Sequence, residues 1–74
     1  METTDVDVDP ALALPAVLRA TGLSRSALWR QVRARTFPLP IRLAPRRIGW
    51  RASAVKAWLD SRPTVDIYRR KEVR

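Results

Sequence analysis

The sequence predicts a mainly α-helical domain with one small β-hairpin. Two observations support this: three short amphipathic segments are each closed by glycine or proline, and an alternating apolar stretch lies between the second and third. The 74 residues have room for one small hydrophobic core. Residues 22–35 are the most informative, because a tight turn, a helix cap and an arginine-rich helix follow one another there.

Residues 1–11 are predicted to form a flexible acidic arm. Four of the seven acidic residues of the chain lie in its first nine positions, without a helical or strand period. Residues 10–74 keep all fifteen basic residues and three acidic ones, a net charge of +12. A folded unit this basic repels itself unless a polyanion neutralises it, and DNA or RNA is the usual polyanion. A GC-rich genome would explain arginine in place of lysine, but not the excess over acidic residues.

The first predicted helix is about two turns long and ends near Gly22, a residue that adopts the left-handed conformation without strain. Pro15 suits a first helical position. The apolar side consists of Val17, Leu18 and Ala20. Ser24 can accept a hydrogen bond from the free N–H groups of the next helix. One helix therefore ends and another begins within about three residues, the spacing of a helix-turn-helix.

The second predicted helix runs from about Arg25 to Arg35 and has two unlike faces. At 3.6 residues per turn, Leu28 and Val32 lie on its inner side. The opposite side consists of Ser26, Arg30 and Arg33. Trp29 and Arg25 lie at the boundary between the two faces. The Trp29 indole either completes the core or lies against a nucleic-acid backbone, and we expect the core because large aromatic side chains usually bury most of their surface. The prolines at positions 38 and 40 cannot continue the helix.

Residues 40–50 alternate apolar and polar on both sides of a basic tip, which predicts a short hairpin. One apolar face is expected, made of Ile41, Leu43, Ile48 and Trp50. The tip, Ala44-Pro45-Arg46-Arg47, has no glycine, so its turn type stays open.

A third helix is predicted from Ala52 to Arg62, before Pro63. Its apolar positions are Val55, Trp58 and Leu59. Residues 64–74 hold a few apolar residues and then a basic run. Three interpretations of this segment stay open: a disordered basic tail, a fourth helix, or a strand offered to a partner.

Composition excludes several classes of function. The chain has no cysteine and no histidine, so disulfides, thiolate nucleophiles, zinc sites of the usual ligands and imidazole catalysis are absent. The few carboxylates are scattered, and we expect no enzyme, no metal and no cofactor. No apolar run approaches the roughly 20 residues that span a bilayer, and the amino terminus is too acidic for a signal peptide. We therefore expect a cytoplasmic protein without a membrane partner.

Three motifs in the run from Leu14 to Leu59 resemble a known family. These are Thr-Gly-Leu-Ser-Arg-Ser, Phe-Pro-x-Pro and Ile-Gly-Trp. In this order they are similar to AlpA-type regulators and phage excisionases, small winged helix-turn-helix proteins related to the DNA-binding heads of MerR-like regulators. The resemblance implies a winged helix-turn-helix domain over residues 12–62, followed by a basic carboxy-terminal tail over residues 63–74.

The resemblance also implies that the second helix enters the major groove of double-stranded DNA. Arg30 and Arg33 are then candidates for base contacts, with Ser26 beside them, since arginine can bond both acceptors on a guanine edge. Contact with phosphates is equally open for both arginines. Arg25, in the first turn of the helix, is expected to hold a phosphate.

The hairpin is implied to act as the wing, against the adjacent backbone or minor groove. Arg46 and Arg47 at its tip suit a narrow, electronegative minor groove or the phosphates beside it, and the alternative is a solvated turn. Arg42 and Arg51 lie on the polar side of the hairpin and are weaker candidates.

Two functions fit these features. The first is an excisionase, or recombination directionality factor, that binds repeated sites, bends DNA and assists a tyrosine or serine integrase at the nucleoid of a bacterial host. The second is an AlpA-type transcriptional regulator at a promoter. Self-association on DNA through the tail is expected for the first, with Val65, Ile67 and Tyr68 as contact residues. An RNA-binding or protein-interaction module leaves the arginine-rich helix unexplained.

Overall fold

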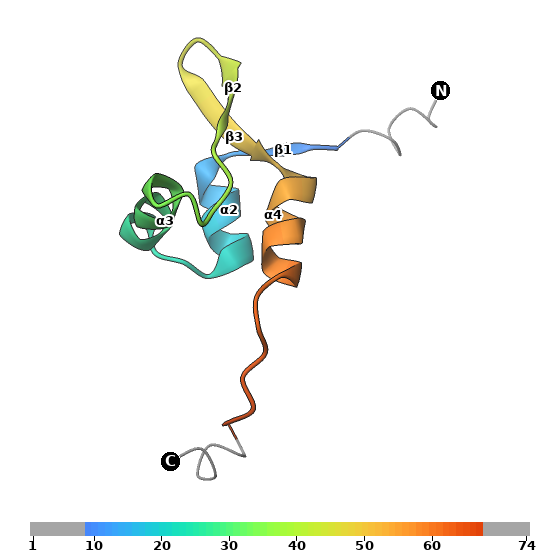
Figure 1. Cartoon of the computed structure of the whole chain (residues 1–74). Helices are drawn as coiled ribbons and strands as arrows, with labels where there is room; N and C mark the ends of the chain where they lie inside the picture. Colours follow the sequence, from blue (N-terminus) through green and yellow to red (C-terminus); the bar gives the residue numbers. More distant parts are fainter. Residues whose placement is uncertain (1–8, 68–74) are drawn as a thin grey trace, which may run out of the picture.

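The computed structural model describes residues 9–67, which form three helices and a small three-stranded sheet (Figure 1). The elements are β1 (Ala11–Leu12), α2 (Leu14–Thr21), α3 (Arg25–Arg33), β2 (Ile41–Ala44), β3 (Arg47–Arg51) and α4 (Ala52–Asp60). The sheet is antiparallel with β3 at its centre. This confirms the predicted mainly helical fold with a hairpin. None of the helices within residues 9–67 is long and apolar enough to cross a membrane.

The turn between α2 and α3 is built as the sequence predicts. Gly22 ends α2 in the left-handed conformation, with φ of 75°, and its N–H donates to the carbonyl of Leu18 at 2.8 Å. Ser24 begins α3, and its hydroxyl accepts a hydrogen bond from the backbone N–H of Ala27 at 3.1 Å. Each helix end therefore has partners for backbone groups that would otherwise be unpaired.

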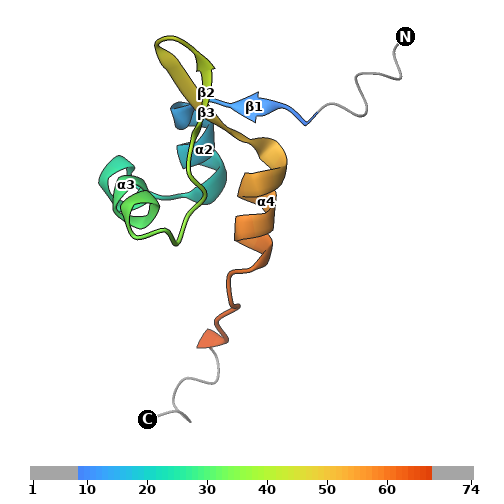
Figure 2. The same cartoon turned by 45° about the horizontal axis from the view of Figure 1, so that its top comes forward.

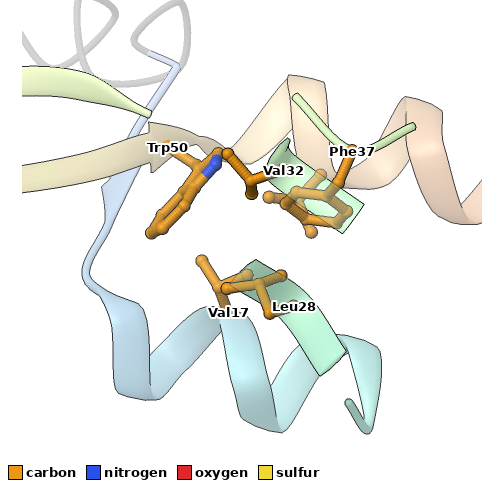
Figure 3. Close-up of a cluster of buried hydrophobic side chains, with 6 residues drawn as sticks. Val17, Leu28, Val32, Phe37 and Trp50 are labelled. Atoms are coloured by element: carbon orange, nitrogen blue, oxygen red, sulfur yellow. The ribbon is translucent and has the colours of Figure 1, made fainter. Parts of the chain in front are cut away.

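The core lies where the helices meet β3 (Figure 3). Its buried members are Val17, Leu28, Val32, Phe37, Trp50 and Val55. Trp50 is 1% exposed, and its indole Nε1 donates to the carbonyl of Pro38 at 2.8 Å. This bond satisfies the polar end of the buried ring and ties the connector after α3 to the core. Trp29 is half-buried with its ring centroid 5.7 Å from that of Trp50, which confirms the prediction that it packs on the core.

The hairpin contains a register shift. Beside its turn Ala44 lies opposite Arg47, whereas further along Ile41 lies opposite Gly49. Leu43 is therefore an extra residue in β2, a β-bulge. Side chains alternate between the two faces of a strand. One extra residue in β2 therefore moves the side chains beyond it to the opposite face of the sheet.

The predicted single apolar face of the hairpin is wrong for this reason. Ile48 lies opposite Arg42, and it shares a face of β3 with Trp50. Ile41 lies on the other face. Trp50 is buried, but Leu43 is 40% exposed and Ile48 is 36% exposed. Only Trp50 of the four enters the buried cluster.

Gly49 allows β1 and β2 to approach β3 closely. A Cβ atom at this position would lie 2.6 Å from the carbonyl oxygen of Leu12 and 2.8 Å from Cδ1 of Leu43. Both distances are too short for any side chain, and one of the two atoms belongs to the backbone. The glycine of the Ile-Gly-Trp motif is therefore needed for the sheet to close.

The domain begins before the predicted boundary at residue 11. Ala11 lies opposite Arg51, and Leu12 lies opposite Trp50, so the amino-terminal strand forms one edge of the sheet. The assignment of residues 9–11 to a flexible arm is corrected accordingly. The remaining arm residues, 1–8, lie outside the described part of the chain.

The same amino-terminal segment caps α4. The carbonyl of Pro10 accepts from the N–H of Ala52 at 2.7 Å, and the Asp9 carboxylate accepts from the N–H of Ser53 at 2.9 Å and from its hydroxyl. The hydrogen bond from the Ser53 hydroxyl, then that from its N–H, lowers the pKa of Asp9, and the charge of Arg51 acts in the same direction. Asp9 is thus held as a carboxylate at the positive end of the α4 dipole.

Helix α4 ends at Asp60, two residues before the predicted end. The Ser61 hydroxyl donates to the carbonyl of Trp58 at 2.7 Å, and the Arg62 guanidinium lies 4.6 Å from the centre of the Trp58 ring. Residues 63–66 form neither helix nor strand and run away from the domain (Figure 1). Residues 68–74 of the predicted tail, including Tyr68, lie outside the described residues.

Candidate nucleic-acid interface

Helix α3 carries four exposed candidate residues: Ser26, Arg30 and Arg33 share the face opposite the core, and Arg25 lies at the boundary of that face in the first turn. Leu28, on the opposite face, is fully buried, and Val32 is buried one turn later. Burial of these two residues holds the helix against the core, so the polar face points away from it.

The end of α3 differs from the prediction. The helix stops at Arg33 because Arg35 adopts a left-handed conformation with φ of 65°. The N–H of Arg35 donates to the carbonyl of Val32 at 3.1 Å, and the N–H of Thr36 donates to that of Gln31 at 3.0 Å. This is a Schellman motif with arginine at the position that usually holds glycine. No glycine in the sequence marked this end, so sequence reasoning placed it too late.

Arg35 adds a further exposed arginine just beyond the predicted group. Its Nη1 donates to the Val32 carbonyl at 3.4 Å, which keeps the side chain close to the end of α3. A left-handed conformation costs a residue with a Cβ about 1 kcal/mol or more. The hydrogen bonds of the motif offset this cost.

The hairpin tip presents the other two candidates. Arg46 and Arg47 are exposed, and neither has a positive φ. The turn is therefore not a type that requires glycine or asparagine at a positive φ. The β-bulge at Leu43, just before the turn, adjusts the pairing of β2 and β3 to it. Arg42 is turned toward the tip, because its Nη1 donates to the carbonyl of Pro45 at 2.8 Å.

The six predicted site residues form two groups on separate elements. Four lie on α3, three of them on its outer face, and two lie at the tip of the hairpin, which projects beyond the helices (Figure 2). Helices α3 and α4 lie on opposite sides of α2 in both views, so α4 does not cover the exposed face of α3 (Figures 1 and 2).

The positive charges of both groups have no carboxylate partner among residues 9–67. No arginine of α3 or of the hairpin tip forms an ion pair in this part of the chain. Asp9 is engaged with Ser53, and Asp60 pairs with Lys56 at 2.8 Å on α4. The hydrogen bond with Asp60, and then the charge of its carboxylate, raises the pKa of Lys56. The surface of α3 and the hairpin tip is consequently a donor-rich cationic surface.

Comparisons with known proteins identify the family of this chain. The family model described as "Prophage CP4-57 regulatory protein (AlpA)" matches residues 11–63. An uncharacterised protein of Enterobacteria phage P4, ORF88, is 32% identical over 62 residues, which cover 84% of this chain and 70% of the phage protein. No solved structure was found to match. The resemblance seen in the three sequence motifs is confirmed, and the chain belongs to the AlpA family of prophage regulatory proteins.

Proposed function

We propose that this protein binds double-stranded DNA sequence-specifically through α3 and the hairpin. The observation that carries the proposal is the exposure on α3 of three arginines and a serine that have no carboxylate partner within residues 9–67, on a helix anchored by Leu28 and Val32. A helix of this kind fits the major groove, and an exposed basic hairpin fits the groove or backbone beside it. No catalytic step is part of this role.

Each group of residues has a separate task in this proposal. Arg30 and Arg33 contact base edges with Ser26 nearby, and Arg25 holds a phosphate near the start of the helix. Arg46 and Arg47 follow the minor groove or its phosphates. Arg30→Ala or Arg33→Ala therefore relaxes sequence preference and costs about 1–3 kcal/mol of binding free energy. On duplexes that share one flank, Arg46→Ala with Arg47→Ala weakens binding to all core sequences about equally.

A salt titration of duplex binding tests the basic proposal. If about 5 phosphates are neutralised, the logarithm of the binding constant falls with the logarithm of salt concentration at a slope of about −4 to −5. Arg19→Ala, on the exposed end of α2, is the matched control that leaves both candidate groups unchanged. A flat salt response, or preference for single strands in competition, contradicts the proposal.

We further propose that the protein acts as an excisionase at the nucleoid, binding repeated sites side by side, bending DNA and assisting a tyrosine or serine integrase. A single small domain buries roughly 600–1,000 Å² on DNA, so neighbouring copies would add needed affinity. The exposed apolar residues Val65 and Ile67, 76% and 58% exposed, are available for such contacts. The alternative is a promoter regulator, which the family description as a regulatory protein favours.

Removal of residues 64–74 tests the excisionase against the promoter regulator. It is expected to leave single-site binding nearly unchanged, but to lower cooperativity on a fragment with several sites and to reduce bending in a circular-permutation gel. Val65→Ser with Ile67→Ser tests the apolar contacts alone and keeps the basic residues. Unchanged cooperativity rejects the role of the tail, and a fragment left straight by the full chain favours the promoter regulator.

A further inference from the structure

We infer that the preferred DNA site carries guanines beneath α3 and, on one side only, an A·T-rich stretch with a narrow minor groove beneath the hairpin tip. This inference rests on the proposed DNA-binding function and specifies which duplex the same surface selects. It follows from the hydrogen-bonding character of the exposed side chains in each group.

The outer face of α3 offers almost only donors. The guanidinium groups of Arg30 and Arg33 cannot accept a hydrogen bond, and α3 has no carboxylate. A matching major-groove edge must therefore consist of acceptors. Guanine is the base that presents two neighbouring acceptors there, O6 and N7, whereas adenine pairs one acceptor with a donor and cytosine presents a donor.

The residue type that recognises adenine is not available on this face. Gln31 is the one amide side chain of α3, and a glutamine can bond both polar groups of an adenine edge. Gln31 is half-buried, and its Oε1 accepts from the Thr36 hydroxyl at 3.3 Å. That bond engages the Gln31 amide oxygen with a residue beyond the end of α3. Recognition of bases therefore falls to Arg30 and Arg33.

The spacing of the two arginines sets the spacing of the guanines. Arg30 and Arg33 lie three residues apart on one side of the helix, a rise of about 4.5 Å. Base pairs are stacked about 3.4 Å apart along the duplex. The two side chains therefore reach guanines on adjacent base pairs or with one base pair between them.

The hairpin tip selects a different composition for the same chemical reason. Arg46 and Arg47 are exposed donors, and the bond from Arg42 to the Pro45 carbonyl braces the turn that carries them. In the minor groove A·T pairs present only acceptors, whereas G·C pairs add the guanine N2 donor. Narrow A-tract grooves also concentrate negative potential that attracts arginine. The A·T stretch lies about 5 base pairs from the guanines, the separation of neighbouring grooves.

Base analogues test each half of the inference on a duplex selected from a random pool with the full chain. Replacing a core guanine by 7-deazaguanine removes N7 and keeps base pairing, and we expect affinity to fall about 10-fold. The matching variant, Arg30→Ala or Arg33→Ala, has already lost this contact and responds less than about 2-fold. Arg19→Ala, exposed on α2, is expected to respond as the unaltered protein does.

The flank is tested by comparing A·T, G·C and inosine·cytosine pairs. Inosine lacks the N2 amine, so an inosine·cytosine pair resembles A·T in the minor groove and G·C in the major groove. We expect G·C to weaken binding about 3- to 10-fold and inosine·cytosine to restore most of it. The difference disappears in the double variant Arg46→Ala, Arg47→Ala.

The outcomes separate this inference from the proposed function. If specific duplex binding occurs but the selected core lacks guanine, or 7-deazaguanine has no effect, the inference for α3 is wrong and DNA binding stands. If inosine·cytosine pairs bind as weakly as G·C pairs, the inference for the hairpin is wrong. If no duplex is preferred over single strands, the proposed function itself fails.

Discussion

Helices α3 and α4 begin in two different ways. Helix α3 uses a residue of its own N-terminus, because the Ser24 hydroxyl accepts from the N–H of Ala27 three residues later. Helix α4 has no side-chain bond from its own cap residue and uses Asp9, 44 residues before Ser53. A local cap depends only on the chain around it, whereas a distant cap depends on the whole sheet that brings it there.

Gly49→Ala tests the dependence on the sheet and is expected to have the largest effect. The added Cβ meets the Leu12 carbonyl and Leu43, so β1 must move away from β3 and release the groups that cap α4. Overpacking of this kind costs about 1–3 kcal/mol, and each kcal/mol lowers Tm by about 4–8 °C in a domain of this size. The measurement is thermal unfolding, with amide hydrogen exchange at Ala52 and Ser53.

Gly22→Ala is the matched control for that variant. Its Cβ would enter open space, but φ of 75° makes the substitution costly by about 1 kcal/mol. Tm falls, yet exchange at Ala52 and Ser53 follows global stability alone. If Gly49→Ala leaves Tm unchanged, the close approach of β1 to β3 at this position does not contribute to stability.

Ser24→Ala removes the local cap and is expected to cost about 1 kcal/mol, within a range of about 0.5–2. Hydrogen exchange at Ala27 accelerates, because its N–H loses the serine hydroxyl. Ser24→Asp preserves an acceptor at the positive end of the helix dipole and retains stability. Equal losses of stability in Ser24→Ala and Ser24→Asp would show that the Ser24 side chain does not stabilise the protein by capping α3.

Asp9→Ala removes the distant cap and is expected to have a smaller effect, a lowering of Tm that is less than that of Ser24→Ala. Two features limit the loss: the carboxylate is at the surface, and the Pro10 carbonyl still accepts from Ala52. Asp9→Asn keeps an acceptor and serves as the control. A loss larger than that of Ser24→Ala would mean that the distant cap also holds β1 in place.

The pH dependence of stability is the smallest expected difference between the two caps. Hydrogen bonds from Ser53 lower the pKa of Asp9 in the folded state, so its contribution is present above the ordinary carboxyl pKa and is lost as pH falls through the lowered value. Serine does not titrate. Measured as Tm between pH 6 and pH 2, the difference between the unaltered protein and Asp9→Asn should shrink below about pH 4. A constant difference contradicts the bonded carboxylate.

Most of the helix-turn-helix could be predicted from the sequence, and so could the faces of α3. Gly22 and Ser24 act on backbone groups within four residues, and the burial of Leu28 and Val32 follows from helical spacing. The exposure of Ser26, Arg30 and Arg33 follows from the same helical spacing, whereas Arg25 is exposed in the first turn of the helix, and Arg46 and Arg47 at the tip of the hairpin. Their roles on DNA stay predictions, because they depend on a partner.

Two features were decided only by the tertiary structure. The bulge at Leu43 set which hairpin residues share a face, and Asp9 found its partner on α4. Each depends on groups that tertiary packing brings together. The left-handed Arg35 is a local cap that no glycine marks in the sequence. Helical period and local caps act over one turn and are therefore legible in the sequence, whereas strand register and distant caps are settled when the sheet forms around Gly49 and Trp50.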